Sequence, residues 1–297
     1  MTPLGLRYRR ADHALVPAWR RWWPLARQEF LVPFRSKVGI AVFCLCLVPA
    51  VVRLFVLMIR YGMVDFGAAA RGDVIGRSQA WAQWDSGRPE FYVELVMGTW
   101  PGLPVLILLT GSATAGAIAR DRRTNALELL WTRGITPFGY LLARFCGSLG
   151  SLCLVTVAAP LALWVAAALM ADDWQQLTST LPFLGSVLFA LLLVSAVWTA
   201  LCLCLSAMAS SPSQAIVLWC LLLVGSTALA NIAAGVLREP NLRAWLSVWD
   251  AGGTLARHVA GVSTRVALGP ALGFLSGLLL LLGLGAWRRL RVGEAVA

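Results

Sequence analysis

The sequence carries little charge. Charged side chains make up 13% of its 297 residues, whereas 59% of the residues are hydrophobic and the mean hydropathy is +0.75. A soluble domain needs more charge on its surface than this, so the composition excludes an ordinary soluble protein. We therefore expect an integral membrane protein.

Motifs for catalysis and nucleotide binding are missing as well. The one lysine, Lys37, follows Phe34-Arg35-Ser36, so the chain has no P-loop of the form G-x-x-x-x-G-K-[ST]. Neither G-x-S-x-G nor H-E-x-x-H occurs, and the two histidines, His13 and His258, have no matching partners. We expect no catalytic site, metal site or cofactor in this chain. If ATP and Mg²⁺ provide energy, they must bind to a separate polypeptide.

The seven cysteines contain no C-x-x-C pair, and all of them fall inside hydrophobic stretches. This placement argues against disulfides and thiolate metal sites and favours small apolar packing residues.

Long hydrophobic runs predict six membrane-spanning helices in an all-α bundle. One crossing of the hydrocarbon core takes roughly 20 mostly apolar residues. The segment Trp174–Leu237 has no charged residue, and its polar break at 210–214 divides it into two spans. The apolar runs are continuous, unlike the alternating strands of a membrane β-barrel. The expected spans are 39–59, 95–119, 145–171, 181–208, 215–237 and 266–287.

The basic residues are divided unequally between the two sides of this topology. Eight Lys and Arg precede the first span, five lie between the second and third, and three follow the sixth. The segments on the opposite side hold four, none and four. Because basic residues gather on the cytoplasmic side, both termini are predicted to be cytoplasmic in a multi-pass inner (plasma) membrane protein. No folded basic domain is expected, so the net charge of +11 does not indicate nucleic-acid binding.

Two segments outside the spans have helical periodicity. Residues 1–18 form a basic arm, and residues 19–297 are expected to form a single transmembrane domain. After the arm, aromatic and arginine residues occupy opposite faces of an amphipathic helix, which we expect to lie in the cytoplasmic interface and to be interrupted at Pro24 and Pro33. A soluble helix packed on a partner is the alternative. In either case the apolar face of the helix consists of Trp19, Trp22, Trp23, Ala26, Phe30 and Phe34.

The second periodic segment precedes the last span. Leu242, Trp245, Leu246 and Trp249 follow a helical spacing. They predict a helix that lies on the outer leaflet or dips into it, with a break at Gly252-Gly253.

Two polar residues fall inside predicted spans. Arg53 lies about 9 Å below the outer boundary at 1.5 Å per residue, within reach of snorkelling or structural pairing, and a place in the substrate pathway is the alternative. Asn231 is expected to hydrogen-bond a neighbouring helix, and it is the second candidate for the pathway.

The segment between the second and third spans contains a predicted short cytoplasmic helix. Thr124 can cap its start, Glu128 lies near the positive end of its dipole, and Leu127, Leu130 and Trp131 form an apolar patch. Gly134 and Pro137 end it. Such a helix is either a docking surface, with Asp121 and Glu128 as charged flanks, or an ordinary interfacial helix.

This segment resembles the first cytoplasmic loop of type-2 ABC exporter permeases, which commonly reads I-x-x-E-R-x-x-G-T-L-E-x-L-L-x-x-P-I-S before a lysine. Asp121, Asn125, Ala126 and Arg144 replace the family's acidic residue, glycine, threonine and lysine, and Pro137 is shifted. Glu29 through Lys37 resembles the family's elbow before the first span, and 206–215 resembles its turn between the fourth and fifth spans. The loop positions that fit are Ile118, Arg122, Leu127, Glu128, Leu130, Ile135 and Thr136.

The resemblance implies a non-catalytic permease subunit that pairs with a second permease chain, identical or sister. Each subunit would dock on a separate ABC ATPase through the loop helix, and the resemblance assigns Asp121, Arg122 and Thr124 to this coupling site with the apolar patch and Glu128. A mechanical membrane subunit, a secondary transporter and a membrane-embedded enzyme remain alternatives. The secondary transporter lacks the expected inverted repeats, and the enzyme lacks a catalytic constellation.

The predicted topology can be tested by cysteine accessibility. We expect Arg133→Cys, in an otherwise cysteine-free chain, to react with a membrane-impermeant maleimide only after the cells are opened, because the loop faces the cytoplasm. Labelling of this cysteine from outside intact cells would reverse the assignment.

Overall fold

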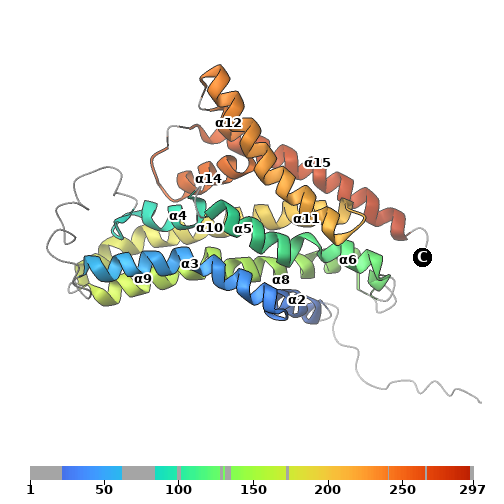
Figure 1. Cartoon of the computed structure of the whole chain (residues 1–297), viewed down its shortest axis with the longest axis horizontal. Coiled ribbons are helices and arrows are strands. Elements are labelled where there is room, and N and C mark those ends of the chain that lie inside the picture. Colours follow the sequence, from blue (N-terminus) through green and yellow to red (C-terminus); the bar gives the residue numbers. More distant parts are fainter. Residues whose placement is uncertain are drawn as a thin grey trace, which may run out of the picture.

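The computed structural model describes residues 22–61, 84–98, 102–127, 130, 135–171, 174–239, 241–264 and 266–294. Over these residues the chain is helical and contains no strand, which confirms the predicted all-α class. Helices α3 (Lys37–Arg60), α8 (Pro137–Thr156), α9 (Ala158–Met170) and α10 (Trp174–Met208) run along the long axis of the molecule (Figure 1).

Five helical segments among the described residues are long and apolar enough to cross a membrane. They correspond to the first and the third to sixth predicted spans, so the chain is a multi-pass membrane protein. The largest difference in boundary is at the third span, which begins at Pro137 instead of residue 145. The five segments are Lys37–Ile59, Pro137–Met170, Thr178–Met208, Pro212–Leu237 and Leu268–Arg289.

The predicted span 95–119 is not one continuous helix. Residues 95–97 belong to a separate helix, α4 (Pro89–Met97), which ends where Gly98 turns to φ −58° and ψ 138°. The chain continues as α5 (Gly102–Thr110), a π-helical turn η4 (Gly111–Ala115) and α6 (Ala117–Arg123). The prediction was wrong in joining α4 to the span, and the count of six crossings stays a prediction.

Hydroxyl side chains start several helices at the positions that capping favours. The Ser36 Oγ accepts a hydrogen bond from the Gly39 amide at 2.9 Å at the start of α3. Thr136 and Ser211 act in the same way before Pro137 and Pro212, which are the first residues of α8 and α11 (Pro212–Cys220). Proline suits this position because it has no N–H to satisfy there.

The first helix of the structure, α2 (Trp23–Phe30), is rotated relative to its predicted orientation. It buries Leu25, Ala26 and Glu29, while Trp23 is 61% exposed. Pro24 lies in the first turn of the helix, which begins at Trp23, and does not interrupt it, whereas Pro33 lies in the short 3₁₀ turn η1 (Val32–Phe34). Residues 1–21, with the predicted basic arm, lie outside the described residues.

The segment before the last span forms two helices, α13 (Leu242–Leu246) and α14 (Val248–Val259). The predicted break at Gly252-Gly253 was wrong, because the chain breaks at Ser247, whose Oγ caps α14 by accepting from the Asp250 amide at 3.0 Å. Trp249 stacks on Trp198 of α10, with 5.2 Å between the ring centroids and 9° between the planes. Gly252 lies against the Trp198 ring, and a Cβ atom here would come within 3.2 Å of the Trp198 Nε1, which is a tight contact.

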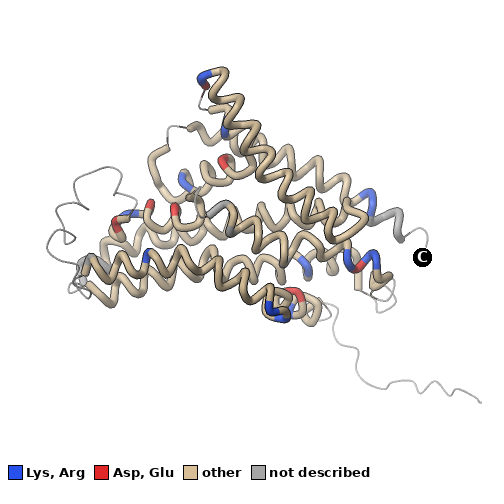
Figure 2. Tube along the Cα trace, in the orientation of Figure 1, with Lys and Arg blue, Asp and Glu red and all other residues tan. Residues whose placement is uncertain are grey.

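The remaining helices complete the bundle. The fifth apolar segment consists of α11, a π-helical turn η5 (Leu221–Gly225) and α12 (Ser226–Leu237), and α12 diverges from the bundle axis (Figure 1). The last helix, α15 (Leu268–Glu294), packs against α10 and α14. Charged residues cluster towards the ends of the bundle (Figure 2).

Close packing of α2 on α8 depends on Gly147. A Cβ atom at this position would collide with the Ala26 carbonyl oxygen and the Glu29 Cβ. We expect Gly147→Ala to lower the free energy of unfolding by about 1–3 kcal/mol, because backbone atoms cannot move aside as a flexible side chain can. Denaturant unfolding of the purified protein in mixed micelles measures this loss.

Gly185→Ala in α10 is the matched control, since no atom lies within 4 Å of a Cβ there. Equal stabilities of the two alanine variants would show that α2 does not pack on α8 as described.

Candidate functional site

Three segments that are distant in the sequence meet at the end of the bundle where α6 lies. Helices α2, α6 and α8 enclose a small apolar cluster together with the ends of α10 and α15. Its larger buried members are Leu25, Ile118, Tyr140 and Leu203. This cluster excludes water from the polar groups beside it.

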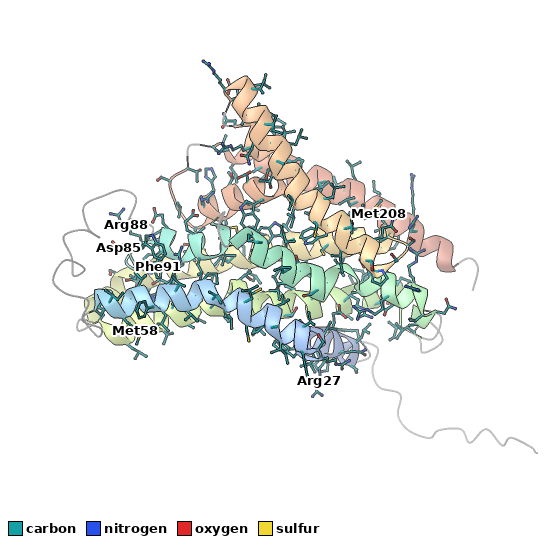
Figure 3. All side chains as sticks on the ribbon, viewed as in Figure 1. Arg27, Met58, Asp85, Arg88, Phe91 and Met208 are labelled. Atoms are coloured by element: carbon teal, nitrogen blue, oxygen red, sulfur yellow. The ribbon has the colours of Figure 1, made fainter. Side chains whose placement is uncertain are left out.

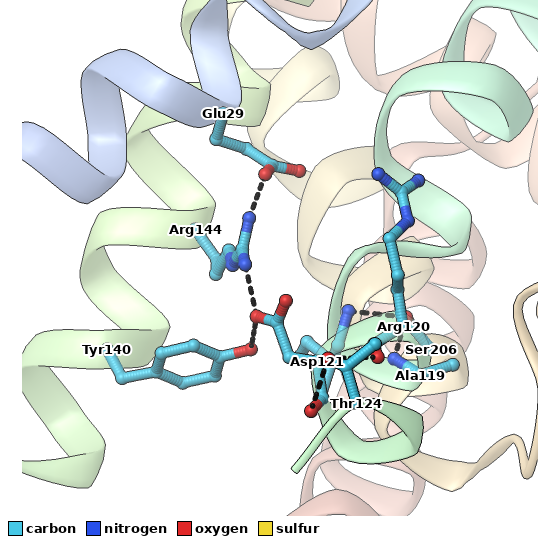
Figure 4. Close-up of polar contacts among 9 residues, drawn as sticks. Glu29, Ala119, Arg120, Asp121, Thr124, Tyr140, Arg144 and Ser206 are labelled. Atoms are coloured by element: carbon cyan, nitrogen blue, oxygen red, sulfur yellow. Dashed lines mark hydrogen bonds and ion pairs between the residues drawn. The ribbon is translucent and has the colours of Figure 1, made fainter. Parts of the chain in front are cut away.

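A buried ion cluster joins the three segments. The Arg144 guanidinium of α8 binds the Glu29 carboxylate of α2 through Nη1 and the Asp121 carboxylate of α6 through Nη2 (Figure 4). The Tyr140 hydroxyl donates a further hydrogen bond to Asp121 Oδ2 at 2.6 Å. The exposed fractions of Glu29, Asp121 and Arg144 are 2%, 9% and 6%. We call Glu29, Asp121, Tyr140 and Arg144 the ion cluster.

The ion cluster contains two carboxylates and one guanidinium. Burial raises the pKa of the Glu29 carboxyl, because desolvation disfavours the charged form, and the Arg144 guanidinium opposes that rise. A guanidinium can satisfy two carboxylates at once with its planar set of donors. Glu29 Oε1 and Arg144 Nε have no hydrogen-bond partner among the described residues. Loss of the arginine would leave two buried carboxylates without a counter-charge.

A serine of α10 holds α6 in place. The Ser206 Oγ accepts hydrogen bonds from the Ile118 amide at 3.0 Å and the Ala119 amide at 3.2 Å. The first amides of a helix have no partner within the helix, so a hydroxyl oxygen from α10 substitutes for an N-cap. Arg122 Nη1 donates to the Ala207 carbonyl at 2.9 Å, which adds a second link between α6 and α10.

The predicted coupling residues are only partly at the surface. Asp121 was predicted to flank the docking surface, but it is buried in the ion cluster. Thr124 was predicted to cap the start of the loop helix, but it ends α6, and its Oγ1 donates to the Arg120 carbonyl at 3.1 Å. Asn125 then adopts φ 52° and turns the chain, and helical residues resume at Ala126 and Leu127.

The apolar patch of the loop also differs from its prediction in part. Leu127 and Leu130 are half-buried and pack on the apolar cluster of this chain, which leaves less of them available to a partner. Glu128 and Trp131 lie outside the described residues. The assignment of these residues to ATPase coupling stays a prediction.

The two predicted intramembrane residues lie away from this end. Arg53 is 7% exposed, and its guanidinium carbon lies 4.9 Å from the Phe91 ring centroid and 5.3 Å from that of Trp84. Phe91 groups with Asp85 and Arg88 at one end of the bundle, whereas Met208 lies near the other end (Figure 3). Asn231 is exposed on α12 and makes no side-chain hydrogen bond among the described residues. Their place in a substrate pathway stays a prediction.

Sequence reasoning did not assign Tyr140, Ser206, Glu29 or Arg144 to the site. Glu29, Asp121 and Arg144 each occupied a position of the family resemblance, in two separate motifs. The sequence signal for the ion cluster was that three ionisable residues lie at the edges of hydrophobic runs. Such residues need charged or hydrogen-bonding partners when they are buried. Among the described residues, no group of three His, Cys, Asp or Glu side chains could hold a metal ion.

The comparisons with known proteins point to one family. A family model described as "ABC-2 family transporter protein" matches residues 87–249, which is more than half of the chain. The matched segment includes α4 to α12, and therefore Asp121, Tyr140, Arg144 and Ser206. A search of curated proteins found no match.

The ion cluster makes Arg144 a stability determinant. We expect Arg144→Met to lower the free energy of unfolding by about 3–5 kcal/mol, because it leaves two buried carboxylates unpaired. Arg144→Lys keeps the positive charge and should lose much less. Denaturant unfolding of the purified protein in mixed micelles compares the two variants.

Arg88→Met provides the matched control, since Arg88 is exposed and pairs with Asp85 at 3.6 Å across the turn before α4. An exposed pair of this kind contributes about 0–1 kcal/mol. A loss for Arg144→Met no larger than that for Arg88→Met would contradict the account of the ion cluster.

Proposed function

Because the chain belongs to the ABC-2 family of transporter proteins, we propose that it is the permease subunit of an ATP-driven exporter in the inner membrane. The chain has no P-loop, so the energy for transport has to come from a separate ATPase subunit. The observation that carries the proposal is the ion cluster, which connects the segment expected to meet that ATPase with two helices of the bundle.

The ion cluster links the loop to the membrane helices at both of its ends. Asp121 lies in α6, just before the loop, and Arg144 lies in α8, just after it. Leu127 and Leu130 pack on the apolar cluster between these two points. A partner that displaces the loop must therefore move α6 and α8 as a unit, and α2 moves with them through Glu29.

A loop held in this way supports alternating access. Two packed arrangements of helices can be selected by a partner that binds one of them more tightly. In this proposal the nucleotide state of the ATPase selects the arrangement, and the substrate passes between this chain and a second permease chain. The coupling residues are those of the predicted helix, with Trp131 as the apolar anchor and Leu127 and Leu130 positioning it.

Trp131→Ala tests the proposed coupling. Buried aromatic anchors contribute about 2 kcal/mol or more to an interface, so the ATPase should bind about thirtyfold more weakly. Leu127→Asp should have at least the same effect, because it also disturbs the apolar cluster. The measurement is the affinity of the purified chain for the P-loop ATPase that co-purifies with it, followed by ATP hydrolysis and transport in reconstituted liposomes.

Trp245→Ala is the matched control, since this tryptophan is 53% exposed on α13, away from the ion cluster. Size-exclusion chromatography in detergent checks that each variant is folded. Wild-type affinity and hydrolysis for Trp131→Ala and Leu127→Asp would refute coupling through this loop. An ATPase that binds and hydrolyses normally, with no compound moved across the membrane, would instead indicate a mechanical subunit.

A further inference from the structure

Four arginines surround an open hollow at the same end of the bundle as the ion cluster. The hollow has a volume of about 550 Å³ and is lined by Arg122 and Arg123 of α6, Ser210 of the turn after α10, and Arg288 and Arg289 of α15. Figure 2 shows Lys and Arg positions on α6 and near the end of α15. We call it the arginine hollow.

Two of the arginines are held in place by the end of α10. Arg122 Nη1 donates to the Ala207 carbonyl at 2.9 Å, and Arg289 Nη1 donates to the Met208 carbonyl. The last carbonyls of a helix have no partner within the helix, and cationic donors suit its negative end. Each guanidinium has five N–H donors and uses one of them here, so the others remain available to a ligand.

Among the side chains that the structure describes, no carboxylate neutralises the arginine hollow. Within the described residues, none of its four arginines forms an ion pair. The acidic side chains described at this end are Glu29 and Asp121, and both are bound to Arg144. The concentrated positive charge therefore lacks a counter-ion from this part of the chain.

The position of the hollow selects among anionic ligands. Arg288 and Arg289 lie at the end of the membrane-spanning segment Leu268–Arg289, and Ser210 lies in the turn between two others, Thr178–Met208 and Pro212–Leu237. Because the hollow lies at the ends of these apolar segments, we expect it at the boundary of the membrane, near the depth of lipid phosphates. Basic pockets at the cytoplasmic ends of membrane helices suit anionic lipid headgroups.

We propose that the arginine hollow binds the phosphate of an anionic lipid headgroup in the leaflet next to the loop. Arg122 and Arg289, fixed on the end of α10, supply oriented donors. Arg123 and Arg288, which are exposed, close on the phosphate from either side. This site is separate from the ion cluster and does not require the ATPase.

The experiment uses the purified full-length chain in a neutral detergent. Binding of dihexanoylphosphatidylglycerol is measured by native mass spectrometry, with dihexanoylphosphatidylcholine and inorganic phosphate in parallel. The test variant is the double substitution Arg123→Gln with Arg288→Gln, because neither side chain makes a described hydrogen bond that supports the fold. We expect it to bind the anionic lipid about thirtyfold more weakly.

Arg243→Gln is the matched control, since Arg243 is an exposed arginine of α13. It should bind the anionic lipid as the wild type does. Equal binding of the anionic and the zwitterionic lipid, or no loss in the double variant, would overturn the proposal. Inorganic phosphate that binds as tightly as the lipid would reassign the hollow to a soluble ligand. A double variant that loses affinity for the ATPase and not for the lipid would reassign it to protein docking.

Discussion

The Arg144 guanidinium, buried between two carboxylates, is the interaction on which this end of the molecule depends. A buried charge is costly unless it is paired and hydrogen-bonded, so α2, α6 and α8 must stay in one arrangement to keep Glu29 and Asp121 in contact with it. The Tyr140 hydroxyl completes the coordination of Asp121. If any one of these helices moved away, a charged side chain would lose its partner. For this reason we expect the three segments to move together.

The two ends of the bundle use charge in different ways. Near the ion cluster, arginines bind carboxylates and helix-terminal carbonyls, and the remaining donors line the arginine hollow. At the opposite end, Arg257 Nε lies 2.7 Å from Glu94 Oε1 and joins α14 to α4, while Arg53 lies under two aromatic rings. At both ends, ion pairs between side chains therefore connect different helices. Between the ends, the long apolar helices pack mainly through hydrophobic contacts.

This arrangement fits a permease that is moved from one end. A membrane helix is a stiff rod, so a shift imposed on α6 and α8 at the loop is transmitted along α8 towards the far end. The apolar interior offers few fixed charges to a passing substrate, apart from Arg53. In the proposed mechanism, the ATPase changes the arrangement of the helices, and a lipid phosphate in the arginine hollow would bias the same helix α6 independently.

Hydrophobicity along the sequence was sufficient to predict a helical membrane protein and five of its spans, since an apolar run of about 20 residues has few stable alternatives in a bilayer. The caps at Ser36 and Thr136 were not predicted, although a cap is a local feature that depends on the next three residues only. The family resemblance singled out Asp121, Arg122, Leu127 and Leu130 as a group, but not which of them are buried.

Only the tertiary structure decided that Asp121 faces inwards, that Glu29 and Arg144 meet it, and that Arg122 and Arg289 share a hollow. It also decided that the helices are interrupted at Gly98 and Ser247, although apolar residues flank both positions. Partners such as Glu29 and Arg144 are 115 residues apart, and no local pattern records which distant charge will neutralise a buried one. Periodicity and capping act over a few residues, whereas the pairing of buried charges depends on how whole helices pack.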